Sequence, residues 1–260
     1  MCEFIRNLVC ANYADMMNKL KADESVIAQL KATNSNLSLA NSNLEKELNE
    51  LKNPNQNELY WNSKYPTSVI KYDSWWSGVQ VDVRWFFFND LIDEFKLIVS
   101  PVLGGTNDEK MLFCQNWVKN NIIYDTDTNT YKVGEYWASP IETLAKRRGD
   151  CEDGAILMAN LAVSAGVPYW RVRLTAGDVQ GGGHCYLTYL SDSQLTKPFI
   201  EQNWKVCDWC YYPDITPFDS RPNYKDEPMY FTNQIWFSFN QKYAFSTQGT
   251  TIGKNYIIHA

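Results

Sequence analysis

The sequence predicts an α+β fold with an N-terminal α-helical coiled coil, and two patterns along the chain lead to this prediction. Residues 1–53 contain no Gly, Pro or Trp, and leucines recur there at intervals of seven. Farther along, three segments that begin with helix caps precede three segments in which apolar and polar residues alternate. Helices followed by antiparallel strands are typical of α+β domains. We therefore predict a coiled-coil domain over residues 1–53 and an α+β domain over residues 54–260.

A seven-residue repeat runs through the N-terminal segment. One heptad position holds Leu30, Leu37, Leu44 and Leu51, and the position three residues earlier holds Leu20, Ile27, Asn34, Asn41 and Leu48. One helix alone cannot bury such a stripe, so we expect residues 9–51 to form an intermolecular coiled coil. The two asparagines favour a parallel dimer, with a trimer as the second choice. The alternative is an amphipathic helix that packs on its own domain, and Asp23 is the one clear break in the repeat.

The coiled coil is expected to end at Asn53-Pro54-Asn55. Proline lacks the N–H that a helix needs, and it biases the residue before it away from helical geometry. From Tyr60 onwards aromatic residues become frequent, which marks the start of a different domain.

Three helices of the second domain are predicted from their caps. Residues Thr106–Glu109 form a capping box, and Ser139–Glu142 form another with proline at the first helical position. Asp150 is expected to cap a third helix, which begins at Cys151 and ends before Gly166. This third helix is apolar on most faces, which predicts that it is buried.

Three strands are predicted after the helices. Apolar and polar residues alternate over residues 169–174, 184–190 and 204–209. Three consecutive glycines, residues 181–183, provide a flexible link between the first two. This spacing indicates antiparallel strands joined by turns.

Composition excludes several classes of protein. The net charge of −6, from 24 basic and 30 acidic residues, makes a nucleic-acid-binding surface unexpected. No apolar run approaches 18 residues, so we expect no membrane span, and the N-terminus shows no signal-peptide pattern. The odd count of seven cysteines leaves at least one free thiol. A cytoplasmic protein is therefore expected, with virion association or non-classical export as alternatives.

Cys151 is the candidate nucleophile, because a helix start favours the thiolate form that attacks carbonyls. Acidic neighbours oppose the thiolate, so an imidazole is needed beside it. The chain has two histidines, and since His259 is the penultimate residue, His184 is the internal candidate. The imidazole needs an acceptor on its other nitrogen, for which Asp208 is the first choice and Asp214 the rival.

The nucleophile segment resembles a known family. Residues 136–144 read YWASPIETL and residues 148–153 read RGDCED, which is similar to the transglutaminase-like cysteine peptidase superfamily. In that family a Gly-His pair supplies the base, as at Gly183-His184, and a Trp-rich strand carries the acid, as at residues 204–208. The resemblance implies a papain/transglutaminase-like core, with the nucleophile helix packed on an antiparallel sheet, and a Cys151-His184-Asp208 triad. The chain departs from the family at Cys185, after the base, and at Trp209-Cys210, after the acid.

The resemblance also bears on cofactors. Periplasmic adhesin-releasing proteases of this superfamily bind calcium through acidic residues that flank the nucleophile, and Asp150 and Glu152 match those positions. The other interpretation is that Asp150 is only a helix cap and that no cofactor is required. The acidic segment 125–129 has the wrong residues at the later positions of a calcium loop, so we expect it to be a solvated turn.

Two further cysteines surround the proposed acid. Cys207-x-x-Cys210 has no second cysteine pair nearby, so we do not expect a zinc or redox site there. If His184 and Asp208 meet on the inner face of the sheet, alternation places Cys185 and Cys207 on the outer face, where an oxidising setting would allow a disulfide.

These patterns lead to one principal functional prediction and two alternatives. We expect a cysteine hydrolase that cleaves amide, peptide or isopeptide bonds in a protein or peptide substrate through a thioester on Cys151. The first alternative is a protein-crosslinking acyltransferase, because the same thioester can transfer its acyl group to an amine. The second is a non-enzymatic oligomeric scaffold or virion structural protein in which the coiled coil is the working part.

Overall fold

The computed structural model describes residues 17–38, 41, 56–65, 69–73, 80–87, 92–211, 215–247 and 251–253. The chain divides into two compact units, Met1–Asn55 and Gln56–Ala260, and each is described by itself. None of the helices in the described ranges combines the length and the apolar character that crossing a bilayer requires.

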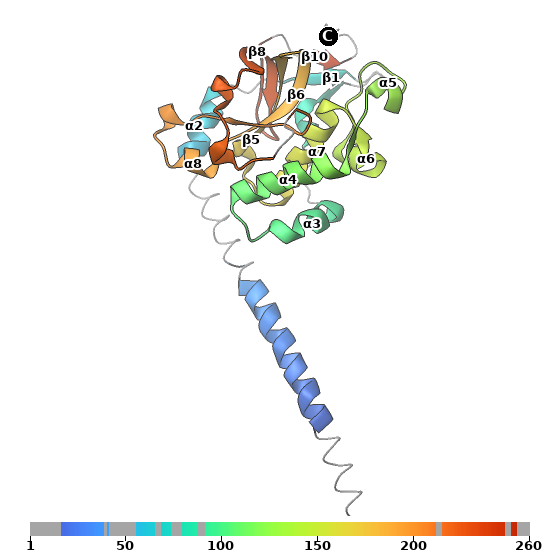
Figure 1. Cartoon of the computed structure of the whole chain (residues 1–260), viewed down its shortest axis with the longest axis vertical. Coiled ribbons are helices and arrows are strands. Elements are labelled where there is room, and N and C mark those ends of the chain that lie inside the picture. The colour runs from blue at the N-terminus through green and yellow to red at the C-terminus, as the bar shows by residue number, and fades with distance from the viewer. Residues whose placement is uncertain are drawn as a thin grey trace, which may run out of the picture. The chain divides into compact units, whose positions relative to one another are not determined.

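In the first unit, residues 17–38 are helical, as the heptad pattern predicts (Figure 1). The heptad residues in this range are exposed to solvent, with Leu30 at 63% and Leu37 at 59%. Leu44, Leu48 and Leu51 lie outside the described residues. The helix is therefore confirmed over 17–38, while its assembly into a coiled coil stays a prediction.

A five-stranded antiparallel sheet forms the centre of the second unit, in the order β7-β6-β5-β8-β9. Its strands are β5 (Val172–Val179), β6 (Gly182–Tyr189), β7 (Lys205–Cys207), β8 (Tyr230–Phe239) and β9 (Ala244–Ser246). A smaller sheet joins β10 (Thr251–Gly253), β1 (Lys71–Asp73) and β2 (Gln80–Asp82). Strands β3 (Ile123–Tyr124) and β4 (Arg148–Gly149) pair in parallel.

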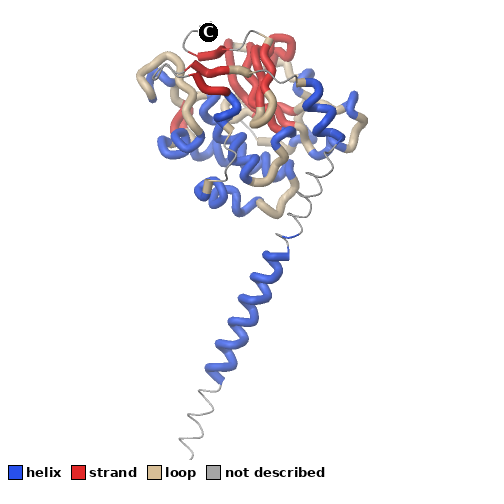
Figure 2. Tube along the Cα trace, turned by 180° about the vertical axis from the view of Figure 1, so that it is seen from behind, coloured by secondary structure: helices blue, strands red, loops and turns tan. Residues whose placement is uncertain are grey.

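Four helices gather on one side of the large sheet, namely α3 (Asp93–Val99), α4 (Asn107–Asn121), α6 (Pro140–Lys146) and α7 (Cys151–Ser164). Figures 1 and 2 show these helices on the same side of the strands. Helix α7 lies against β5 and β6, and the other three pack around α7. The remaining helices are α2 (Gln56–Lys64), α5 (Asp127–Thr130) and α8 (Asp192–Leu195). Helix α7 is thus enclosed by the sheet and by helices, as its apolar sequence predicts.

Two hydrophobic clusters fill the two faces of this sheet. Leu174 and Leu187 belong to the larger cluster, which includes the apolar residues of α7. Tyr186 and Val206 belong to the second cluster, in which Trp61 of α2 takes part. Neighbouring residues of one strand thus face different clusters, as the period of two in a strand requires.

Several predicted boundaries need correction. Residues Tyr169–Arg171 form a 3-10 turn, so the first strand begins at Val172. Thr106 and Ser139 are the N-cap residues of α4 and α6, as predicted. In the Thr106–Glu109 box both reciprocal hydrogen bonds are present. Asp150 is the N-cap residue of α7, but its side chain makes no capping hydrogen bond, so the prediction that it serves as a cap is wrong in this respect.

Candidate active site

Cys151 is the first residue of α7, directly after the short strand β4. The thiol is partly buried and donates a hydrogen bond to Oε2 of Glu152 at 3.2 Å. Burial raises the pKa of the Cys151 thiol well above its usual range, and the neighbouring Asp150 carboxylate adds to this rise. The thiol is therefore protonated in this arrangement, and it needs a base before it can attack a carbonyl.

His184 and Asp208 form a buried pair, as predicted. Nε2 of His184, on β6, lies 2.6 Å from Oδ2 of Asp208, which directly follows β7. The two side chains are 3% and 0% exposed, so the hydrogen bond is shielded from water. Because Nε2 is engaged with the carboxylate, Nδ1 is the nitrogen left to exchange a proton with a nucleophile.

The structure brings the three predicted residues to one end of the sheet, although not all into contact. Burial raises the pKa of Asp150, the residue before Cys151, and the nearby His184 offsets part of this rise. In the described part of the chain, no hydrogen bond joins the thiol of Cys151 to His184. The rival acid, Asp214, lies outside the described residues.

Asp208 is held from several sides. The hydroxyl of Tyr230 donates to Oδ2 at 2.7 Å, the same oxygen that His184 contacts. The backbone N–H of Cys210 donates to Oδ1 at 2.8 Å, and Nε2 of Gln115 donates to the backbone carbonyl at 2.5 Å. The carboxylate therefore has a fixed orientation toward His184. Tyr230 and Gln115 were not predicted, because nothing in their local sequence signals this long-range contact.

The cysteines near the site are placed differently from the prediction. Cys185 and Cys207 belong to the cluster that includes α7, and Sγ of Cys207 lies 3.8 Å from Sδ of Met158 on that helix. Their expected position on an outer face is therefore wrong, because alternation fixes which residues share a face but not which face is inward. The cysteines among the described residues are free thiols, including these two and Cys210.

An acidic cluster lies beside the nucleophile. Its carboxylates come from α5, the segment before α6 and the start of α7: Asp127, Glu135, Asp150, Glu152 and Asp153. In overlapping groups of three, carboxylate oxygens of these residues lie within 4.8 Å of one another. The ion pairs found among the described residues include none of the five. The cluster thus gathers five acidic side chains, none of which forms an ion pair within the described part of the chain.

Several oxygens of this cluster lack hydrogen-bond partners in the described structure. They are Oδ1 of Asp127, Oδ1 of Asp150, Oε1 of Glu152 and Oδ2 of Asp153. Burial and the nearby Asp150 raise the pKa of Asp127 from 3.8 to about 8, and burial and Asp150 raise that of Glu135 from 4.5 to about 7. Buried carboxylates without partners are costly, and hard divalent cations such as calcium bind oxygen ligands of this kind. These residues can hold such a cation.

The predicted solvated turn at residues 125–129 is only partly correct. Asp125 does pair with Arg148 at the surface, at 2.6 Å. Asp127, however, is 2% exposed and points into the acidic cluster, where it accepts a hydrogen bond from the backbone N–H of Tyr136. A calcium loop takes its ligands from one segment of twelve residues, whereas this acidic cluster is assembled from three separate segments.

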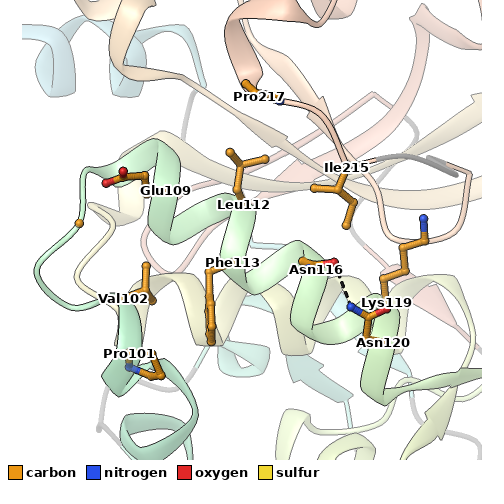
Figure 3. Close-up of a pocket in the computed structure, with 11 residues that line it drawn as sticks. Pro101, Val102, Glu109, Leu112, Phe113, Asn116, Lys119, Asn120, Ile215 and Pro217 are labelled. Carbon is orange, nitrogen blue, oxygen red and sulfur yellow. Dashed lines mark hydrogen bonds between the residues drawn. The ribbon is translucent and has the colours of Figure 1, made fainter.

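A surface groove lies along α4, apart from these residues (Figure 3). It is lined by α4 residues such as Leu112 and Phe113 on one side and by Ile215 and Pro217 on the other. Asn116 and Asn120 also line it, and Nδ2 of Asn120 donates a hydrogen bond to Oδ1 of Asn116 at 3.0 Å. Neither the predicted triad nor the acidic cluster contributes to its lining, so the groove is not the candidate active site.

One comparison with known proteins, that with family models, agrees with the predicted superfamily. Residues 100–208 match the family model described as the Transglutaminase-like superfamily, a range that includes Cys151, His184 and Asp208. The comparison with curated proteins found no match. Among solved structures, the chain is similar to Legionella pneumophila LapG, with 22% identity, a TM-score of 0.45, and coverage of 60% of this chain and 77% of that one. Calcium-bound LapG from the same organism gives 19% identity and a TM-score of 0.44, covering 66% of this chain and 88% of LapG.

Proposed function

From the match of residues 100–208 to the model of the Transglutaminase-like superfamily, we propose that the protein is a cysteine hydrolase that cleaves amide bonds in peptides or isopeptides. The observation that carries this proposal is the buried His184–Asp208 pair, with Nε2 of the histidine 2.6 Å from the carboxylate. A histidine held in one orientation, with its other nitrogen free, is what a cysteine nucleophile requires as its base.

The proposed reaction begins when Nδ1 of His184 takes the proton of the Cys151 thiol. The thiolate attacks the amide carbonyl, and the backbone N–H of Cys151 at the helix start donates to the oxyanion that forms. The carbon–nitrogen bond then breaks, and His184 returns the proton to the leaving amine. Water, deprotonated by His184, hydrolyses the resulting thioester and regenerates the thiol. Throughout, Asp208 accepts the Nε2 proton of His184 as a hydrogen bond and stabilises the imidazolium.

The acidic cluster is proposed to hold a calcium ion, through Asp150 and Glu152 together with Asp127, Glu135 and Asp153. Support comes from the fit of the residues, because the cluster supplies buried oxygens that have no other partner among the described residues. When bound, the cation would supply positive charge that offsets the mutual repulsion of these carboxylates. Asp150 and Glu152 flank Cys151 in the chain, so a cation held by them would lie close to the nucleophile.

Residues 9–51 are proposed to join a second copy of the chain as a coiled coil. The exposed apolar residues along the helix at 17–38 support this, since an isolated helix would leave that stripe in water. Two linked catalytic units would bind a repetitive protein substrate with greater avidity than one.

Incubation of the protein with a peptide library and a labelled primary amine, followed by mass spectrometry, tests the proposed reaction. We expect shortened peptides from the native chain and none from Cys151→Ala. Amine adducts in place of shortened peptides would indicate an acyltransferase. Unchanged cleavage by Cys151→Ala would contradict the proposal.

A further inference from the structure

Trp209 connects the acid of the proposed triad to the nucleophile. It directly follows Asp208 in the chain, and its side chain is buried, with 4% of the residue exposed. Its indole Nε1–H donates a hydrogen bond to the backbone carbonyl oxygen of Cys151 at 3.1 Å. The residue beside the acid is therefore bonded to the backbone of the nucleophile itself, across a sequence separation of 58 residues.

Helix α7 leaves room for this indole at one position. A Cβ atom built on Gly154 would lie 2.1 Å from Cε2 of Trp209 and 2.3 Å from Nε1. Real Cβ atoms do not approach other atoms so closely, so the indole lies directly against the backbone of the helix. Glycine is among the poorest helix formers, and its presence inside a buried helix is explained here by that close approach.

The backbone of Asp208, which precedes Trp209, is also held in place. Asp208 is held by Tyr230 and by the backbone N–H of Cys210, and its backbone carbonyl accepts from Gln115. These hydrogen bonds fix the position of the backbone at Asp208, and therefore also the position of the backbone from which the Trp209 side chain extends. Its hydrogen bond to the Cys151 carbonyl therefore links the segment of the acid to the first residue of α7.

We propose that Trp209 is a positioning residue, which sets the place of Cys151 relative to the His184–Asp208 pair. The inference rests on the proposed function, since it assigns Trp209 a role in the same reaction. Attack by a thiolate requires that the reacting groups be aligned, and a displacement of about 1 Å can cost about 100-fold in rate. A residue that ties the acid segment to the nucleophile backbone controls that alignment.

The test compares Trp209→Phe with Trp204→Phe. Phenylalanine at 209 keeps most of the contact with Gly154 but removes the N–H that bonds Cys151. Trp204 is a matched control, because it is also buried in the same unit and its indole N–H has no partner in the described structure. The readouts are the rate at which chloroacetamide alkylates Cys151, located by peptide mass spectrometry, and the melting temperature.

We expect Trp209→Phe to slow alkylation of Cys151 by roughly tenfold, while Trp204→Phe stays within about twofold of the native chain. With a peptide substrate, Trp209→Phe should lower kcat and leave KM nearly unchanged. Native rates in Trp209→Phe, or equal slowing in both variants, would overturn the inference. If Cys151 reacts no faster than the other cysteines in the native chain, the proposed function itself fails, and the role of Trp209 fails with it.

A double-mutant cycle tests the contact from the side of the helix. Gly154→Ala should lower the melting temperature and slow alkylation when Trp209 is present, because the new methyl group collides with the indole. In a Trp209→Ala background the same change should cost much less, since the space is open. An equal cost in both backgrounds would contradict the proposed contact.

Discussion

Cys151 and His184 are expected to be indispensable at the level of single residues. Replacing either with alanine should lower kcat by at least about three orders of magnitude, because groups that act together lose nearly all catalysis when one is removed. The melting temperature should change little for Cys151→Ala, whose side chain is only partly buried. A His184→Ala chain that retains a tenth of the native rate would contradict the assignment.

Loss of Asp208 should reduce kcat less than loss of His184, because Asp208 orients the base and transfers no proton itself. We expect Asp208→Ala to reduce kcat by a smaller factor than His184→Ala, and Asp214→Ala to leave it nearly native. A larger loss for Asp214→Ala would show that the rival aspartate is the acid. Steady-state kinetics on the three variants measure this order.

Tyr230 shares the carboxylate oxygen of Asp208 with His184, which makes it a sensitive test of the buried pair. Tyr230→Phe should lower kcat by roughly tenfold, equivalent to about 1.4 kcal/mol, which is within the range for the net contribution of one hydrogen bond. Tyr224→Phe is the matched control, because the hydroxyl of Tyr224 bonds Tyr186 and not Asp208. Similar losses in both variants would indicate a general effect on packing.

The chemistry-bearing residues were more predictable than the residues that hold them. His184 is the internal member of two histidines, and Cys151 begins a recognisable helix, so both could be selected from the sequence. Gln115 contacts Asp208 from 93 residues away, and Tyr230 does so from 22 residues away. Such contacts depend on the tertiary fold, which a local pattern does not encode.

The acidic cluster gives a prediction at the level of the elements that meet there, α5 and the start of α7. The folded-state pKa of Asp127 is raised from 3.8 to about 8, and that of Glu135 from 4.5 to about 7. Between about pH 4 and pH 8 the folded chain therefore binds more protons than the unfolded chain, so its free energy of unfolding falls as the pH rises through this range. In the presence of EDTA, the melting temperature should decrease from pH 5 to pH 8.

Calcium should reverse this loss. Added at pH 8, it should raise the melting temperature, and it should do so much less at pH 5, where the carboxylates bind protons instead. Asp127→Asn should weaken the calcium response and flatten the dependence on pH. Asp125→Asn is the control on the same turn, since Asp125 pairs with Arg148 outside the cluster. Equal calcium responses in the two variants would contradict the proposed site.

Element boundaries show where a sequence pattern is sufficient and where it is not. The complete capping box predicted the start of α4 to the residue, because the cap itself defines the helix end. The strand predicted at residues 169–174 begins three residues later, after a 3-10 turn. Tyr169 and Trp170 pack on the second hydrophobic cluster from that turn. Their apolar side chains therefore extended the alternating pattern of the strand beyond its true start.

Self-association is the prediction for the whole molecule. The full chain should form dimers at tens of micromolar, whereas a chain that begins at residue 56 should be monomeric, since the heptad stripe is then absent. Replacing Asn34 and Asn41 with Leu should stabilise the coiled coil and mix its oligomeric states. The same replacement at Asn36 and Asn43, which lie outside the predicted seam, should not. Sedimentation equilibrium measures all four, and a monomeric full chain would mean that the stripe packs elsewhere.

The most direct test of the account is the detection of an acyl group on Cys151. The chain is mixed with a peptide library, quenched in acid, digested and analysed by mass spectrometry. We predict a mass increase on the peptide that contains Cys151, which hydroxylamine removes as it does thioesters and which His184→Ala fails to form. Peptide cleavage by Cys151→Ala, or an acyl group on a different cysteine, would contradict the claim that Cys151 is the nucleophile.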